Sequence, residues 1–410
     1  MSRETDGDEV TLKEIEKAAD VLKDVTHVTP LDHSRTLSEQ TGIDLYLKME
    51  NMQRAGSFKM RGAYYKIHSL TDSERKKGVV AASAGNHAQG VAYAATLLGV
   101  KSTIVMPESA SPAKIDATKG YGAEVVLHGA NFDAALEMGK EISRKKDATF
   151  IHAFDDPMVV AGQGTAGLEI MEAAPELQTI VVAIGGGGLI SGVGVAAKSV
   201  KPKVKVVGVQ SEAFPSMYMA FKTAKLVPYK TQETIADGIA VKQPGKLTYK
   251  LIRKYVDDVV LVPDTDIADA IFFMLERMKI VAEPAGAASV AACMNGLVKA
   301  RGEKAAAIVS GGNIDMYLLD QIVTKVLEKQ RRLVRVRILI SDKPGALRDI
   351  IDVIAASRAH VVSIEHDRVG EEVPIGKAEV ILNLETQNAE HTKTLTSALS
   401  KSRMKYRVES

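Results

Sequence analysis

Two segments, residues 79–100 and 177–197, each run for more than twenty residues without Asp, Glu, Lys or Arg. Either is long enough to suggest a membrane-spanning helix. Glycines interrupt both, however, since Gly85 and Gly90 divide the first segment and the run 185–188 divides the second. Each segment therefore reads as a short strand, a loop and a helix. An uncharged strand, loop and helix of this kind favours a parallel sheet that is buried on both faces.

The same strand-then-helix pattern recurs along most of the chain. A capping-box pattern at Thr11–Glu14 predicts a helix before the first strand. Strand-like runs follow, separated by helical patterns, at 79–83, 102–106, 123–127, 179–184, 204–209, 258–262 and 305–310. This alternation predicts an α/β fold, a doubly wound parallel sheet with ligands at the carboxyl ends of its strands.

Near Lys329 the pattern changes, because K-Q-R-R is followed by L-V-R-V-R-I-L-I. Strict alternation of this kind suits a sheet with one wet face. The following segments read as helix, strand, strand, helix and strand, at 345–357, 360–367, 378–384, 389–400 and 404–408. The order βαββαβ predicts an α+β ferredoxin-like domain over residues 329–410, after a first region over 1–328.

Composition excludes several classes of protein. The 410 residues carry 53 basic and 51 acidic side chains, a net charge of +2, so no concentrated basic face for nucleic acid is indicated. The single cysteine, Cys293, precludes an internal disulfide, and no cluster has zinc spacing. Glu212 and Glu283 form no recognisable metal site. The polar, acidic N-terminus is unlike a signal peptide and predicts a frayed tail. We expect a cytoplasmic protein with a small-molecule partner and no membrane partner.

Lys59 lies in S-F-K-M-R-G, between Phe58 and Met60, in a stretch that predicts the buried start of a helix. An ammonium group there loses hydration that it cannot easily replace. One interpretation is that the side chain reaches solvent or pairs with Glu50. The other is a desolvated amine kept nucleophilic for Schiff-base chemistry.

Four consecutive glycines follow a strand and open a helix: Gly185, Gly186, Gly187 and Gly188. Backbone N–H groups and a helix N-terminus could cradle a phosphate there. A flexible linker is a weaker interpretation, because apolar runs bound the glycines. A dinucleotide site is a rival, in which Gly192 completes a G-x-G-x-x-x-G variant and Glu212 binds a ribose. That rival leaves Lys59 and two other loops unassigned.

Those two loops are S-A-G-N-H at 83–87 and S-G-G-N at 310–313, each at a strand end. Taken alone, either could be an ordinary turn or helix cap. Together with Lys59 and the glycines, they supply an amine, a phosphate cradle, an amide for a phenolic oxygen and a hydroxyl for a ring nitrogen. That combination describes a site for pyridoxal 5'-phosphate.

The motifs S-F-K-M-R-G, S-A-G-N-H-A-Q-G, G-G-G-G-L-I-S-G and S-G-G-N-I-D resemble those of the fold-type II pyridoxal phosphate enzymes, most closely threonine dehydratases (threonine ammonia-lyases). The likeness spans roughly residues 10–325. It implies a large lobe at about 1–52 and 153–328 and a small lobe at about 53–152. It implies that Lys59 is the catalytic residue and that cofactor-binding residues are Phe58, Lys59, Asn86, Gly185, Gly186, Gly187, Gly188, Leu189, Ser310 and Gly311. The substrate carboxylate would contact Ser83, Ala84, Gly85, Asn86 and His87.

By the same resemblance, the enzyme would convert threonine to 2-oxobutyrate and ammonia, and serine to pyruvate. Similar serine racemases carry a second serine where this chain has Ala84, and alanine cannot shuttle a proton, so dehydration should dominate. A sister lyase or racemase remains an alternative. A non-catalytic amino-acid sensor is a further one, which the presence of Lys59 disfavours.

The segment D-K-P-G-A-L-R-D-I at 342–350 could be a simple turn before a helix. With βαββαβ around it, it resembles an ACT domain, a regulatory module that binds amino acids, usually across a dimer interface. The resemblance implies an allosteric site at Pro344, Gly345, Ala346, Leu347, His360 and Val361. Isoleucine or valine is the hypothetical effector, and a homo-oligomer, dimer or tetramer, is expected.

Overall fold

A computed structural model describes residues 10–409 except 228, 230 and 403, so the predicted frayed tail at 1–9 lies outside the described residues. The chain divides into two compact units, Met1–Asp315 and Met316–Ser410. This division precedes the predicted one at 328/329. The difference is helix α14 (Met316–Lys329), which contacts strand β11 of the second unit and groups with it.

A six-stranded sheet forms the centre of the first unit, with strand order β1-β2-β10-β7-β8-β9. All of its pairs are parallel except β1 with β2, which confirms the predicted α/β class. Its strands are β1 (Leu31–His33), β2 (Asp44–Lys48), β7 (Thr179–Ala183), β8 (Lys205–Ser211), β9 (Asp258–Val262) and β10 (Lys304–Ile308). Strands β1 and β2 were not predicted, because they are short and partly exposed.

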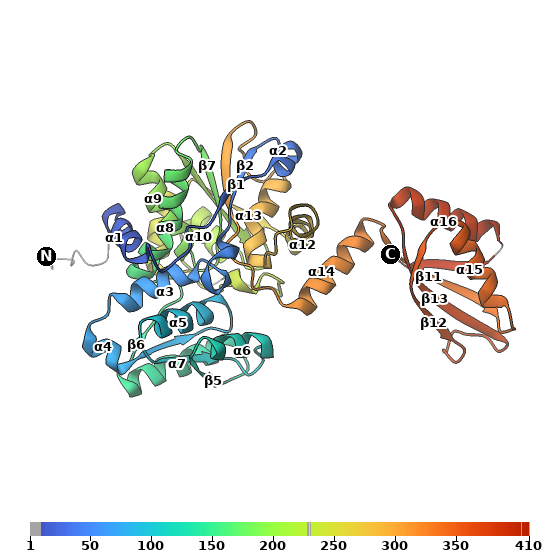
Figure 1. The fold of residues 1–410 in the computed structure, drawn as a ribbon, viewed down its shortest axis with the longest axis horizontal. Helices are drawn as coiled ribbons and strands as arrows, with labels where there is room; N and C mark the ends of the chain where they lie inside the picture. The colour runs from blue at the N-terminus through green and yellow to red at the C-terminus, as the bar shows by residue number, and fades with distance from the viewer. Residues whose placement is uncertain (1–9, 228, 230, 403, 410) are drawn as a thin grey trace. The chain divides into compact units, whose positions relative to one another are not determined.

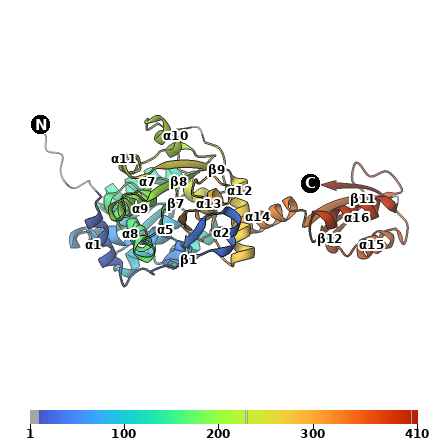
Figure 2. The same cartoon turned by 90° about the horizontal axis from the view of Figure 1, so that it is seen from above.

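Helices cover both faces of this sheet (Figure 1). Helices α8 (Pro157–Ala173) and α9 (Gly188–Val200) pack together, and the core between α9 and the strands is aliphatic. Helices α12 (Asp264–Phe273) and α13 (Pro284–Met294) pack together, with α13 against β7, β8 and β10. At the β9 edge lie α10 (Ser216–Thr223) and α11 (Lys246–Tyr255), as Figure 2 shows.

A second, four-stranded parallel sheet has the order β5-β4-β3-β6. Its strands are β3 (Val79–Ala82), β4 (Ser102–Met106), β5 (Glu124–Leu127) and β6 (Thr149–Phe150). The helices around it are α3 (Lys59–His68), α4 (Asp72–Lys77), α5 (Asn86–Leu97), α6 (Pro112–Gly120) and α7 (Phe132–Lys146). The two uncharged segments are thus β3, loop and α5, and β7, loop and α9, as predicted. Across the described residues, no helix combines the length and apolarity of a bilayer span.

Helix α1 (Leu12–Leu22) begins after Thr11, whose hydroxyl accepts a hydrogen bond from the Glu14 N–H at 3.3 Å. The predicted capping box forms only in this half. The Glu14 carboxylate accepts instead from the Tyr65 hydroxyl at 2.5 Å, which ties α1 to α3. Helix α2 (Arg35–Thr41) completes the N-terminal region.

The second unit has the predicted βαββαβ order after α14. Its elements are β11 (Leu333–Ser341), α15 (Ala346–Ala356), β12 (His360–Asp367), β13 (Lys377–Glu385), α16 (Ala389–Lys401) and β14 (Lys405–Glu409). The strands form an antiparallel sheet in the order β12-β13-β11-β14. Alternate residues of β11 (Val334, Val336, Ile338) pack with both helices into one aliphatic core. The other face carries Arg337, paired with Glu379 and Glu409.

Candidate active site

Lys59 is held against the loop that follows β10. Ser57 forms an isolated antiparallel bridge with Gly311. The Phe58 N–H donates to the Ser310 carbonyl at 3.2 Å, and the Gly312 N–H donates to the Gly56 carbonyl at 2.9 Å. Two motifs that are some 250 residues apart in the chain are therefore joined through their backbones.

The Lys59 side chain extends from the first residue of α3 to the loop after β6. Its Nζ donates to the Ala153 carbonyl at 3.2 Å and lies 5.2 Å from the centre of the Phe58 ring. Burial lowers the pKa of Lys59 from 10.5 to about 8, although the nearby Glu283 carboxylate favours the charged form. The proposed partner Glu50 is not available to it, because the Glu50 carboxylate bonds Arg61 and Thr29.

Asn86 is the first residue of α5, and its amide is oriented from both sides. Its Nδ2 donates to Glu283 Oε1 at 2.5 Å, and its Oδ1 accepts from Asn313 Nδ2 at 2.8 Å. Burial, with the charge of Asp237, raises the pKa of Glu283 to about 7, against the Asn86 hydrogen bond. These two contacts leave one Asn86 N–H free to bond a ligand.

The loop 83–85 leads into the uncapped N-terminus of α5. The Ser83 hydroxyl accepts from the Gly85 N–H at 3.2 Å, and a Cβ on Gly85 would meet no atom within 4 Å. The first N–H groups of a helix lack acceptors within it, so this end can bind a carboxylate. The His87 side chain faces elsewhere, because Nε2 contacts the Ile151 carbonyl at 2.9 Å. Burial and the Lys59 charge lower the pKa of His87 to about 3, so the ring is neutral.

The glycine loop connects β7 to α9, which begins without a side-chain cap after Gly187 (φ +93°). Side chains would not fit there. A Cβ on Gly186 would come within 2.2 Å of the Phe154 ring, and one on Gly187 within 2.8 Å of Ile252. The Thr248 hydroxyl donates to the Gly186 carbonyl at 2.7 Å. Backbone N–H groups at an uncapped helix start form an anion cradle.

Ser310 completes the set. Its hydroxyl is buried and has a long contact of 3.4 Å to the Ala285 carbonyl. A Cβ on Gly311 would lie 2.3 Å from Glu283 Oε1, so a side chain there would displace the Glu283 carboxylate. An amine, an oriented amide, a glycine cradle and a neutral hydroxyl are the groups that pyridoxal phosphate requires. The residues present fit this cofactor, while the separate role of each stays a prediction.

Some contacts around Lys59 and Asn86 were not predicted from the sequence. Ala153 accepts from Lys59, Phe154 packs on Gly186, and Glu283 and Asn313 orient Asn86. One signal for the first two was available, since H-A-F-D-D follows the last strand of its sheet. The position of Glu283 depends on tertiary packing, and local sequence does not reveal it.

The predicted effector residues do not come together within one chain. Residues 344–347 lie just beyond Ser341, where β11 ends. His360, at the start of β12, is level with Glu385 and hence with Leu333, where β11 begins. The two groups therefore lie at opposite ends of the sheet, roughly 25 Å apart at about 3.3 Å per residue.

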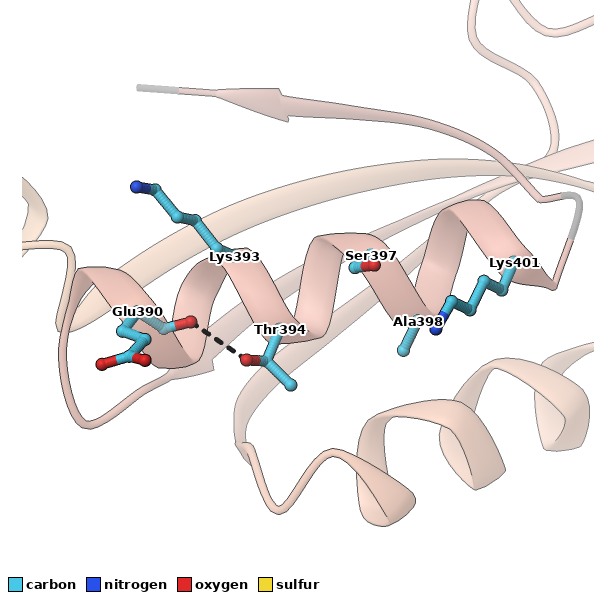
Figure 3. A pocket seen from close by; sticks show the side chains of 6 residues that line it. All are labelled: Glu390, Lys393, Thr394, Ser397, Ala398 and Lys401. Carbon is cyan, nitrogen blue, oxygen red and sulfur yellow. Dashed lines mark hydrogen bonds between the residues drawn. The ribbon is translucent and has the colours of Figure 1, made fainter.

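A hollow of about 390 Å³ on the outer side of α16 is a poor candidate for a site. It is lined by Glu390, Lys393, Thr394, Ser397, Ala398 and Lys401. Figure 3 shows these side chains spaced along a single helix, with the Thr394 hydroxyl bonded to the Glu390 carbonyl at 3.1 Å. Nothing in them converges on a common point.

The fold and the loops define an enzyme that works through pyridoxal phosphate. Residues 22–311 match the family model described as "Pyridoxal-phosphate dependent enzyme", and the chain belongs to that family. It is 51% identical to an L-threonine ammonia-lyase of Thermotoga maritima over 390 residues, 95% of this chain and 97% of that protein. It is 45% identical to the catabolic L-threonine dehydratase TdcB of Escherichia coli over 315 residues, 76% of this chain and 96% of that protein. Maize serine racemase superposes with a TM-score of 0.73 at 36% identity, covering 78% of this chain and 98% of that structure.

The first prediction concerns the Lys59 amine. In cofactor-free protein, the rate at which pyridoxal attaches to Lys59 should rise with pH. The midpoint of this rise should lie near pH 8, because burial lowers the pKa of the amine. Glu283→Gln should move that midpoint lower, since it removes a charge that favours the ammonium form. The measurement is absorbance against pH, with Lys59→Ala as the blank. A midpoint near 10.5, the ordinary value, would contradict the prediction.

Proposed function

We propose that this protein is a pyridoxal phosphate-dependent lyase that converts L-threonine to 2-oxobutyrate and ammonia, with L-serine to pyruvate as a secondary reaction. The observation that carries the proposal is the partly desolvated Lys59 amine, beside an uncapped helix N-terminus and a glycine cradle. The sequence identity to two proteins named for this reaction supports the choice of substrate.

When bound, pyridoxal phosphate delocalises the electrons left at Cα of an attached amino acid. Lys59 would hold the cofactor covalently. Its amine, when neutral and free, would take the Cα proton, for which a pKa near 8 is well suited. The N-terminus of α5 binds the substrate carboxylate and so orients the Cα–H bond.

The remaining residues would hold the cofactor. The free N–H of Asn86 would bind the ring oxygen, and the N–H groups of the glycine loop would bind the phosphate. Ser310 offers the ring nitrogen a neutral hydroxyl, whereas a carboxylate would keep that nitrogen protonated. This neutral partner would favour prompt elimination of the β-hydroxyl over reversible chemistry at Cα, with the proton removed from Cα and the departing hydroxyl together accounting for the one water that is lost.

Racemisation of serine is the alternative reaction, because the chain is similar to maize serine racemase. The residue at position 84 favours elimination over that alternative. The loop 83–85 carries no second acid or base, since the side chain between Ser83 and Gly85 is the methyl group of Ala84. A proton cannot be delivered to the opposite side of Cα by this residue. Elimination should therefore dominate.

The second prediction tests this choice. With L-serine as substrate, the rate of pyruvate release should exceed the rate of D-serine formation by about 10²-fold or more, because the second general acid is missing. Given L-threonine, the enzyme should release 2-oxobutyrate and ammonia in equal amounts. For serine, a keto-acid assay and chiral chromatography are applied to one reaction. For threonine, a keto-acid assay and an ammonia assay are applied to another. Inversion of serine that outpaces keto-acid release would reject the dehydratase.

For the second unit we propose an ACT-type regulatory role, with isoleucine or valine as effector. The βαββαβ order and Gly345 (φ +93°) at the uncapped start of α15 support an amino-acid site at Pro344, Gly345, Ala346 and Leu347. Because His360 and Val361 lie at the other end of the sheet, a complete site would take them from a second copy. This arrangement would require a homo-oligomer, a dimer or a tetramer. We also propose a cytoplasmic location.

A further inference from the structure

Four consecutive residues, Ala153 to Asp156, each contact a different part of the candidate active site or its supports. Ala153 accepts from Lys59 Nζ, and the Phe154 ring lies against Gly186. Asp156 accepts from Met158 N at 2.9 Å and so begins α8. The contacts of Asp155 are the ones that the proposed reaction does not explain.

The Asp155 carboxylate caps a helix from another part of the chain. Three N–H groups at the start of α11 donate to it, from Lys246 at 3.0 Å, Leu247 at 2.9 Å and Thr248 at 3.1 Å. Gly245, the residue before α11, offers no side chain as a cap. A Cβ on Gly245 would lie 2.2 Å from Asp155 Oδ1, so only glycine leaves room for the carboxylate. Because Gly245 has φ −71°, this requirement is steric and does not come from the backbone conformation.

Helix α11 in turn holds the glycine loop. Thr248 is fully buried, and its hydroxyl donates to the Gly186 carbonyl at 2.7 Å. In a trans peptide the C=O and the following N–H point in opposite directions. With the Gly186 carbonyl held on Thr248, the Gly187 N–H is turned away from α11. The bond thus keeps a carbonyl oxygen from facing an anion and presents a donor instead.

We propose that Asp155 is a positioning residue for the phosphate of pyridoxal phosphate, acting through the first turn of α11 and the Thr248 hydroxyl on the Gly186 peptide. It places α11 so that Thr248 reaches the glycine loop. Asp155 itself does not contact the anion in this arrangement. Removing the Asp155 carboxylate should weaken binding of the phosphate and leave the attachment at Lys59 intact.

The test compares two aldehydes that differ only by the phosphate, pyridoxal phosphate and pyridoxal, both of which attach to Lys59. Dissociation constants are measured by absorbance and fluorescence on cofactor-free full-length protein. Asp155→Ala and Thr248→Val should each raise the constant for pyridoxal phosphate roughly tenfold and leave that for pyridoxal nearly unchanged. Gly245→Ala should act like Asp155→Ala, because its methyl group displaces the carboxylate.

Three comparisons sharpen the result. Thr248→Ser keeps the hydroxyl and should bind like the wild type. Thr71→Ala removes an exposed cap from α4 and should leave both constants unchanged. The double variant Asp155→Ala/Thr248→Val should raise the dissociation constant for pyridoxal phosphate no more than the more damaging single variant does, because the two residues act in series. Equal losses for both aldehydes, additive losses, or full retention in Asp155→Ala would each overturn the proposal. None of these outcomes depends on which amino acid is the substrate.

Discussion

Replacing Lys59 with alanine is expected to lower kcat by on the order of 10⁴-fold or more, because the same amine holds the cofactor and takes the Cα proton. The visible absorbance of the covalently held cofactor should disappear as well. Steady-state keto-acid release and the absorbance spectrum, recorded on one preparation reconstituted with pyridoxal phosphate, measure both effects.

Folding should survive this change. Among residues 10–409 as far as the structure describes them, the Lys59 side chain makes one hydrogen bond, to Ala153, and its burial disfavours the charged form. Lys76→Ala, on the exposed helix α4, is the matched control and should retain full turnover. A folded Lys59→Ala protein that kept more than about a hundredth of the wild-type rate would require another base.

The ends of the strands at which the site loops lie could be predicted from topology. Loops after β3, β7 and β10 leave parallel strands at their carboxyl ends, where ligands of α/β sheets bind. Because β3 belongs to the four-stranded sheet and β7 and β10 belong to the six-stranded sheet, their meeting at one site depends on how the two sheets pack. The residue types in those loops, glycines before a helix and an amide at a helix start, indicated the chemistry. Those features are local, so they can be read from one sequence.

Features that depend on which elements meet could not be predicted. The Thr11 capping box formed only half, because the Glu14 carboxylate bonds Tyr65 of α3. The cap of α11 comes from Asp155, about ninety residues away in the chain. Glu50, offered from the sequence as a partner for Lys59, pairs with Arg61 instead. In each case a carboxylate bonds a group on another element. The spacing of residues along the chain does not reveal such a partner.

The second unit shows the same limit. The order of its elements along the chain, βαββαβ, was predicted, but the register of the strands decides which loops are neighbours. The pairing of His360 with Glu385, and of Glu385 with Leu333, separates the two predicted halves of the effector site. An intrachain site is thereby excluded for those residues as a set, and the proposal of a second copy follows from that separation.

The largest effect on stability is expected at a buried cluster of charged side chains around Arg61, which lies two residues after Lys59. Arg61 is fully buried and donates to the Glu50 carboxylate through Nε and Nη2, both at 2.8 Å. It also donates to Glu169 of α8, at 2.5 and 2.9 Å. Lys48 of β2 donates to Glu169 at 2.5 Å, so two cations face two carboxylates. The cluster joins α3, which carries Lys59, to β2 and α8.

Arg61→Met should lower the free energy of unfolding by about 3–5 kcal/mol, because it leaves a buried carboxylate without its cation. Burial alone would raise the pKa of Glu50, but the Arg61 charge and hydrogen bonds lower it overall. The unfolded chain then binds the proton more readily, so this contribution is present at neutral pH and is lost as pH falls below about 4.5. The measurement is the urea midpoint of the full chain at pH 7 and at pH 4.

Removing the partner charge as well should restore part of the loss. Arg61→Met/Glu50→Gln should be more stable at pH 7 than Arg61→Met, since no unpaired charge remains at that position. Arg35→Met breaks an exposed pair with Glu39 on α2 and should leave the midpoint unchanged. If Arg61→Met shifted the midpoint no further than Arg35→Met does, the cluster would have no part in holding α3 in place. The position of Lys59 would then depend on the backbone bonds to residues 310–312 and on the packing of α3 against α5 and α8.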